Sequence, residues 1–77
     1  MPNLLKLAAG TTATIAALSG NQEEDGHLAG IGLYPGARVT ILRASRNGQP
    51  LLVQIHGSQF MLEREVAEQI FVSDESV

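Results

Sequence analysis

The sequence predicts a mainly β protein, a small barrel of about five strands with one or two short helices. Five segments carry the apolar and β-branched residues that strands favour, and Gly, Pro and Asn turn signals separate most of them. Only two stretches have helical character, and both are brief. The predicted strands are residues 12–18, 38–43, 51–56, 59–62 and 70–72. With 77 residues, the chain has room for one domain, residues 1–77, with a small core.

Charge and composition exclude several classes of function. The net charge of −3 repels a nucleic acid backbone, so we expect no nucleic acid partner. The chain has no cysteine, so neither disulfides nor thiolate metal sites stabilise it. No apolar run approaches the roughly 20 residues needed to cross a bilayer, so we expect no membrane insertion. The first 20 residues resemble a secretory signal only weakly, because three threonines interrupt the apolar stretch.

The first predicted strand, Thr12 to Leu18, lies between Gly10 and Gly20. The next segment, residues 21–26, is polar and acidic, and this composition predicts a loop. Residues 27–31 then predict one or two turns of helix, which Gly32 ends.

The stretch from Gly30 to Ile41 superficially resembles a phosphate-binding loop, because it contains three glycines. A dinucleotide fingerprint, however, follows a strand and opens a full helix, whereas here a short helix precedes the glycines and a strand follows them. The glycines therefore indicate backbone geometry. We expect Gly32 to stop the helix, and Pro35 with Gly36 to form the centre of a type II turn.

The central strands are predicted from their alternation. In Arg38 to Arg43, the residues Val39 and Ile41 share one face of the strand. Asn47-Gly48 is a strong hairpin signal, because both residues tolerate a positive φ. The return strand, residues 51–56, directs its odd-numbered residues to the core.

The last third of the chain predicts a turn at residues 57–58, a strand at 59–62, a short helical segment at 63–69 and a strand at 70–72. Phe60 and Phe71 are expected in the core. The final residues are polar, and we expect them to be frayed.

A divalent transition metal is the only cofactor that the residues favour. The acidic run and the histidine behind it carry oxygen and imidazole ligands, which suit Fe²⁺, Mn²⁺ or Zn²⁺. This predicted set consists of Glu23, Glu24, Asp25 and His27, with His56 as a further candidate. The structural alternative is a solvated acidic loop.

No residue pattern supports catalysis, so we expect no enzyme. The serines lack a nucleophile elbow, and the three glutamates at positions 63, 65 and 68 are typical of an exposed helix face. A groove for proline-rich peptides needs more aromatic rings than Tyr34, Phe60 and Phe71 supply. Apolar residues beyond those that five short strands need indicate a partner surface. They are Leu4, Leu5, Leu7, Leu28, Ile31, Leu33 and Leu52.

Several motifs together resemble the FeoA family of ferrous iron transport proteins. They are the leucines between Leu4 and Gly10, the segment IGLYPGARVTIL at 31–42, NGQP at 47–50 and FMLEREVAEQIFV at 60–72. The most specific parts are Leu33 to Val39 and Leu62 to Val72. Members commonly have Met where this chain has Ile31. A related domain ends the metal-dependent regulators of the diphtheria-toxin-repressor type.

The resemblance implies an SH3-like barrel, a cytoplasmic location and an accessory role in ferrous iron uptake. The implied partner is the cytosolic, GTPase-containing part of the FeoB-type permease. We expect the partner surface at Leu28, Ile31, Leu33 and Tyr34. The alternative is a metal-binding or metal-sensing domain, like those of the iron-dependent regulators. Formation of a homo-oligomer is left open.

Overall fold

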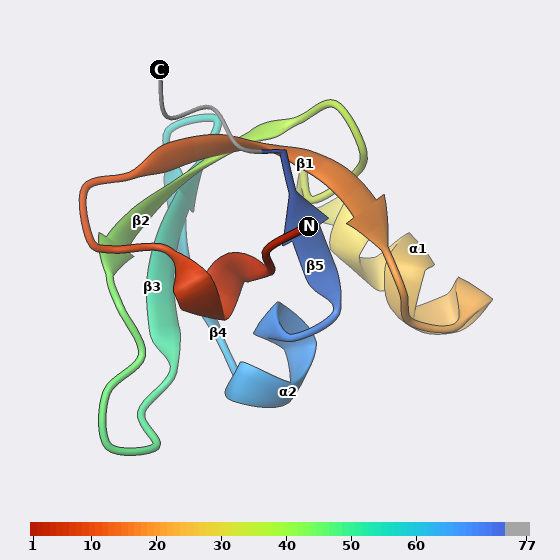
Figure 1. The fold of residues 1–77 in the computed structure, drawn as a ribbon. Coiled ribbons are helices and arrows are strands. Elements are labelled where there is room, and N and C mark those ends of the chain that lie inside the picture. Colours follow the sequence, from red (N-terminus) through yellow and green to blue (C-terminus); the bar gives the residue numbers. More distant parts are fainter. Residues whose placement is uncertain (74–77) are drawn as a thin grey trace.

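The computed structural model describes residues 1–73, and its central feature is one five-stranded antiparallel sheet (Figure 1). The strands follow the order β4-β3-β2-β1-β5. Their bounds are β1 Thr12–Leu18, β2 Arg38–Arg43, β3 Leu51–Ile55, β4 Ser58–Leu62 and β5 Ile70–Val72. The predicted mainly β fold with five strands is confirmed. The sheet is an open barrel, because β4 and β5 form its two edges instead of pairing with each other. The predicted fraying concerns residues 74–77, which lie outside the described residues.

Three helical segments accompany the sheet. They are the 3-10 helix η1 at Leu4–Lys6, α1 at Gln22–Gly30 and α2 at Arg64–Ala67. The prediction of a loop at 21–26 was wrong, because α1 begins there. A capping box starts this helix: the Glu24 N–H donates to Asn21 Oδ1 at 2.8 Å, and the Asn21 N–H donates to Glu24 Oε1 at 3.1 Å. Acidic residues in the first turn also interact favourably with the helix dipole.

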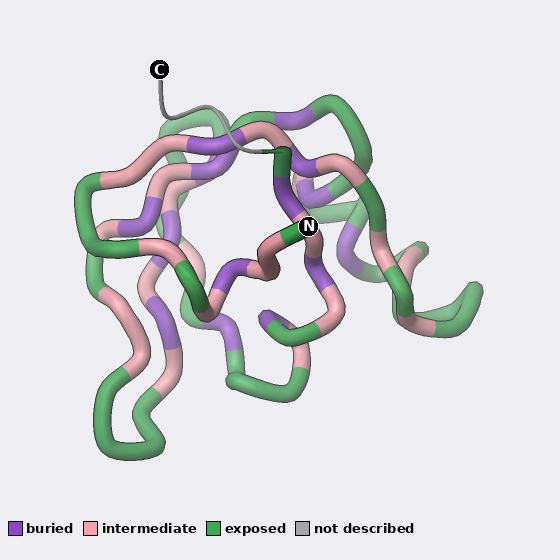
Figure 2. The backbone as a smooth tube through the Cα atoms, in the orientation of Figure 1, coloured by how far each residue is buried: buried purple, intermediate pink, exposed green. Residues whose placement is uncertain are grey.

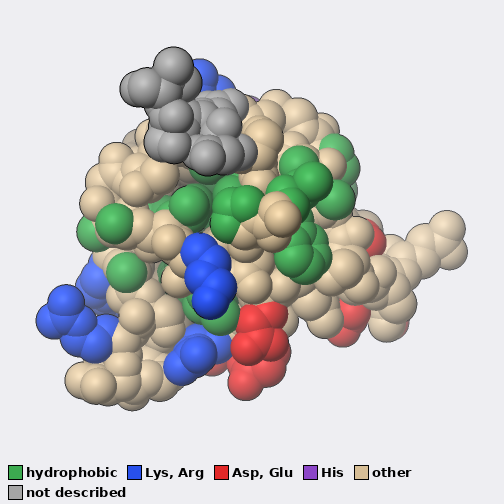
Figure 3. All heavy atoms as spheres, viewed as in Figure 1, with side chains coloured by type: hydrophobic (Ala, Val, Ile, Leu, Met, Phe, Trp, Pro, Cys, Tyr) green, Lys and Arg blue, Asp and Glu red, His purple; other side chains and the backbone are tan. Residues whose placement is uncertain are grey.

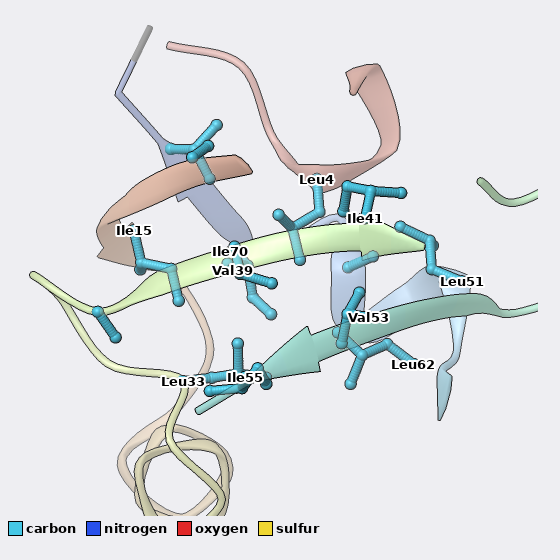
Figure 4. Packing of buried hydrophobic residues seen from close by; sticks show 14 of the residues in the cluster. Leu4, Ile15, Leu33, Val39, Ile41, Leu51, Val53, Ile55, Leu62 and Ile70 are labelled. Carbon is cyan, nitrogen blue, oxygen red and sulfur yellow. The ribbon is translucent and has the colours of Figure 1, made fainter. Parts of the chain in front are cut away.

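The core lies inside the curved sheet and takes alternate residues from the strands (Figure 4). Val39 and Ile41 of β2 are buried as predicted, and so are Leu51, Val53 and Ile55 of β3. Figure 2 shows this alternation as buried and partly exposed positions along the strands. Within residues 1–73 the buried set contains no polar or charged residue. Its other members are Leu4, Ala13, Ile15, Leu28, Leu33, Ala37, Leu62, Ala67, Ile70 and Val72.

Phe60 and Phe71 depart from the prediction, because both are only partly buried. Leucine, isoleucine and valine side chains fill the centre of this small core, and Phe60 packs against it from β4. Leu4 from η1 is fully buried as well, so the N-terminal segment is part of the core. Much of the apolar surplus seen in the sequence therefore packs in the core and is not exposed.

The two edges of the sheet differ. The β5 edge is covered by the start of the chain, because the Val72 N–H donates to the Pro2 carbonyl at 2.9 Å and Asn3 forms a bridge with Phe71. The β4 edge has no such cover among the described residues: β3 is the only strand that pairs with β4.

Two of the predicted turns are present, and the third, predicted at 57–58, lies one residue earlier, at His56-Gly57. The Ala37 N–H donates to the Tyr34 carbonyl at 3.0 Å, and Gly36 has a φ of +98°, as a type II turn requires. Asn47 and Gly48 both have positive φ, and the Gln49 N–H donates to the Arg46 carbonyl at 3.0 Å.

Candidate partner-binding site

The candidate site lies where α1 ends and the chain turns into β2. The Leu33 N–H donates to the Leu28 carbonyl at 2.8 Å, and the Gly32 N–H donates to the Ala29 carbonyl at 3.1 Å. These two bonds form a Schellman motif, and Gly32 takes the positive φ that the motif needs, +106°. Gly32 is the helix stop that the sequence predicts.

The same motif corrects part of the predicted partner surface. A Schellman motif brings the residue after the glycine against the residue that lies five positions before it. These two residues are Leu33 and Leu28, and both are buried, Leu33 completely. They belong to the core and are not available to a partner, so the expectation that they lie on the surface was wrong.

Gly32 also fixes the helix end against the sheet. A Cβ atom on this residue would lie 2.7 Å from Ile55 Cγ2 and 3.1 Å from His56 Cδ2. The backbone therefore approaches the end of β3 more closely than any larger residue allows. In Figure 4, Leu33 and Ile55 lie beside each other, next to the α1 coil.

Ile31 and Tyr34 flank the buried Leu33, and both stay on the surface. Their side chains are 37% and 40% exposed. The Schellman motif holds Ile31 from one side, and the Pro35-Gly36 turn holds Tyr34 from the other. Two apolar side chains are thus presented on a connection that is anchored at both ends.

His56 joins this surface from the turn between β3 and β4. Its ring stacks beside the Tyr34 ring, with centroids 6.4 Å apart and planes 28° apart. Tyr34 Oη and His56 Nε2 are 3.5 Å apart. Together with their neighbours they line a shallow hollow of about 480 Å³. The other lining residues are Gly36, Ala37, Arg38, Thr40, Gln54 and Gly57.

Sequence reasoning missed this role of His56, because it placed the residue in a strand. His56 has a φ of +50° and Gly57 one of +83°, so the two residues form the tight turn of the hairpin. Histidine is enriched at positive φ among residues other than glycine, and the His-Gly pair was the signal that could have found the turn.

The acidic side chains form two groups. Acidic residues lie in the first turn of α1 and along α2, where Glu63, Glu65 and Glu68 are exposed. Among residues 1–73, the lining of the hollow beside Tyr34 includes Arg38 and His56 and no carboxylate. On the face drawn in Figure 3, most basic side chains lie to the left and the acidic ones to the right, and the two kinds meet at the lower edge.

The structure does not assemble the predicted metal ligands into one site. Glu23, Glu24, Asp25 and His27 all lie on α1, and residues 1–73 contain no group of three histidine or acidic side chains that could hold a metal ion. Glu24 serves in the helix cap. Three oxygens, Glu24 Oε1, Asp25 Oδ1 and Gln69 Oε1, do lie within 2.9 Å of where a Cβ on Gly20 would be. Asp25 Oδ1 is buried there without a hydrogen-bond partner.

A family model, the FeoA domain, matches residues 3–74. The chain belongs to the FeoA family. Its resemblance to that family, which the sequence motifs indicated, is confirmed. No curated protein matches the chain by sequence. None of the helices within residues 1–73 is long and apolar enough to cross a membrane.

Solved structures of FeoA proteins have the same fold as this chain. The FeoA protein of Chlorobium tepidum is 28% identical, with a TM-score of 0.86 over 97% of this chain and 71% of that one. The FeoA of Stenotrophomonas maltophilia, an SH3 domain protein solved with zinc, is 25% identical, with a TM-score of 0.81 over 95% of this chain and 91% of that one. The fold is therefore SH3-like.

The fold also occurs within a longer protein. A manganese-dependent transcriptional repressor matches with a TM-score of 0.82 at 24% identity, over 92% of this chain and 40% of the repressor chain. This likeness concerns the fold of one part of the repressor.

Proposed function

We propose that this FeoA-family chain is a cytoplasmic accessory module of ferrous iron uptake that works by binding, without catalysing a reaction. Its partner in this proposal is the cytosolic, GTPase-containing part of a FeoB-type permease. The contact surface consists of Ile31, Tyr34 and His56. The observation that carries the proposal is the exposure of two apolar side chains on a rigid connection, beside a hollow that Tyr34 and His56 line.

Rigidity favours binding here, because the contact residues lose little conformational freedom when a partner docks. Apolar and aromatic side chains at the centre of a surface also contribute most of the energy in typical interfaces.

The test is a calorimetric titration of the permease's cytosolic domain with this protein, with and without guanine nucleotide. We expect binding that Ile31→Asp and Tyr34→Ala each weaken at least about tenfold. Met61→Ala is the matched control, because Met61 is exposed but lies on β4, and we expect it to bind like the original chain. Absence of binding by the folded protein at tens of micromolar would overturn the proposal.

Binding of a divalent metal is the second candidate. It is favoured by the buried, unpartnered Asp25 Oδ1 beside Glu24 and Gln69, and by the zinc in the Stenotrophomonas maltophilia relative. Anaerobic calorimetry with Fe²⁺ and Mn²⁺ tests it. We expect heat of binding that Asp25→Asn abolishes and His27→Ala leaves unchanged. No heat with either ion would rule this candidate out.

A further inference from the structure

Within residues 1–73, no strand pairs with the outer edge of β4. The strand pairs with β3 from the pair of Ile55 and Ser58, next to the turn, to the pair of Leu51 and Leu62 at the far end. The two-residue turn His56-Gly57 joins the two strands. In such a hairpin the pair next to the turn is hydrogen-bonded, and bonded and non-bonded pairs then alternate. The pairs that include Gln59 and Met61 are non-bonded, so the N–H and C=O groups of these two residues point away from β3.

This edge lacks the features that normally prevent strand pairing. The sequence of β4, Ser-Gln-Phe-Met-Leu, contains no charge and no proline. Its ladder with β3 runs through five consecutive pairs without a bulge, whereas the β1–β5 and β2–β3 ladders are both irregular. The other edge of the sheet, β5, is covered by Pro2 and Asn3. An edge without a bulge or a charge, and without cover from residues 1–73, is a template for another strand.

We infer that β4 pairs with β4 of a second copy of this chain, antiparallel, about a two-fold axis at Phe60. Gln59 of each copy then lies opposite Met61 of the other, and the four outward N–H groups of the two strands meet four carbonyls. A second copy fits because β4 carries no charge, so self-pairing opposes no like charges. The interface is isologous, and the assembly stops at two copies.

Side chains support this register. Phe60 is partly exposed on β4, and the axis places the two Phe60 rings directly opposite each other in a non-bonded pair, where side chains come closest. Met61 is 59% exposed on the outer face and would be covered by the neighbouring strand. A shift by two residues toward the turn would use Gly57, whose φ of +83° takes it out of the strand. A shift the other way would use Glu63, the N-cap of α2.

The first test removes one hydrogen-bond donor from the edge. In sedimentation experiments, we expect the dimer fraction of the original chain to rise as the protein concentration increases from about 10 µM to about 1 mM. Association is expected to be this weak because one strand pair is a small interface. Met61→Pro should be monomeric over the whole range, since it lacks the N–H that donates to the second copy. The monomer should still fold, since this N–H makes no bond to β3. Met61→Ala keeps the N–H and should still dimerise. A monomeric original chain, or a Met61→Pro dimer as strong as the original, would overturn the inference.

The second test uses charged substitutions alone, so it remains valid even if Met61→Pro disturbs folding. Gln59→Lys with Met61→Lys places four lysines side by side on the outer face, and we expect a monomer. Gln59→Glu with Met61→Lys sets Glu opposite Lys across the axis, and we expect the dimer to return. Dimerisation of both double variants, or of neither, would overturn the register. Both variants should bind the permease domain unchanged, which separates this test from that of the proposed function.

Discussion

The two connections that flank β2 both turn at glycines with positive φ but have different relations to the core. The connection from α1 to β2, residues 31–37, contains two glycines with positive φ and buries Leu33 between them. The hairpin loop from β2 to β3, residues 44–50, also has a positive-φ glycine, Gly48, but its tip from Arg46 to Gln49 is exposed (Figure 1). A Cβ on Gly32 would meet Ile55, whereas one on Gly48 would meet nothing within 4 Å.

The comparison shows that a turn becomes a fixed platform only when side chains beside it enter the core. In the α1–β2 connection, the burial of Leu33 fixes the direction of its exposed neighbours. In the β2–β3 loop, local hydrogen bonds such as Ser45 Oγ to the Gln49 carbonyl, 2.7 Å, hold the shape, and no residue of the loop is buried. Substitutions in the two connections should therefore have very different effects on stability.

The largest expected effect is that of Leu33→Ala. Removal of a fully buried leucine side chain should lower the free energy of unfolding by about 3 kcal/mol. Arg46→Ala, at the exposed tip of the other loop, should change it by less than about 0.5 kcal/mol. Urea unfolding followed by circular dichroism measures both. Equal effects would show that the two connections do not differ in their coupling to the core.

Gly32→Ala should have the next largest effect, roughly 2 kcal/mol or more, because alanine at this φ is strained and its Cβ overlaps Ile55 Cγ2. Gly48→Ala has the strain without the overlap, so it should cost about 1 kcal/mol. The difference between the urea unfolding midpoints of the two variants measures the cost of the overlap with β3. A Gly32→Ala variant as stable as Gly48→Ala would mean that this contact relaxes without cost.

Asn21→Ala tests the other end of α1. It removes the side chain that accepts from the Glu24 N–H, and it should lower the free energy of unfolding by about 1 kcal/mol. Asn21→Ser is the matched control, because serine also caps helices, and we expect it to be close to the original chain. If the alanine variant unfolds at the same urea concentration as the serine variant, the capping box contributes nothing.

Gly30→Ala should have the smallest effect, with the opposite sign. Gly30 is the last residue of α1, has open space for a Cβ and lacks a positive φ. Alanine should therefore raise stability by roughly 0.5 kcal/mol, seen as a higher melting temperature. A lower melting temperature would show that the end of α1 needs the freedom of glycine at Gly30 as well as at Gly32.

The strands could be predicted because each carries its burial pattern in its own residues. The alternation of Val39 with Ile41, and of Leu51 with Val53, determines which face is buried. The first turn of α1 was missed because Gly26 lowers its helix propensity and the acidic run was interpreted as a solvated loop, although Asn21 and Glu24 were there as a capping signal. The open edge at β4 could not be predicted, because sheet closure depends on contacts between strands far apart in sequence.

The candidate site was predicted in part. The turn geometry around Gly32 and Pro35 follows from local backbone preferences, so it could be read from the sequence. Whether Leu33 or Tyr34 faces the core depends on the Schellman motif and on β3, which is distant along the chain. His56 and Tyr34 come together only when the sheet folds, so their contact could not be predicted from the sequence and was found in the structure.

The cover that Pro2 and Asn3 place over β5 has a consequence for synthesis of the chain. Val72 donates to Pro2, and β1 pairs with β5, so the first and last parts of the fold depend on each other. Such long-range pairing makes folding slow, and β1 lacks one neighbour until residue 72 has left the ribosome. The nascent chain therefore exposes apolar residues such as Leu4 and Ile15 until the segment up to residue 72 has been made and can join the sheet.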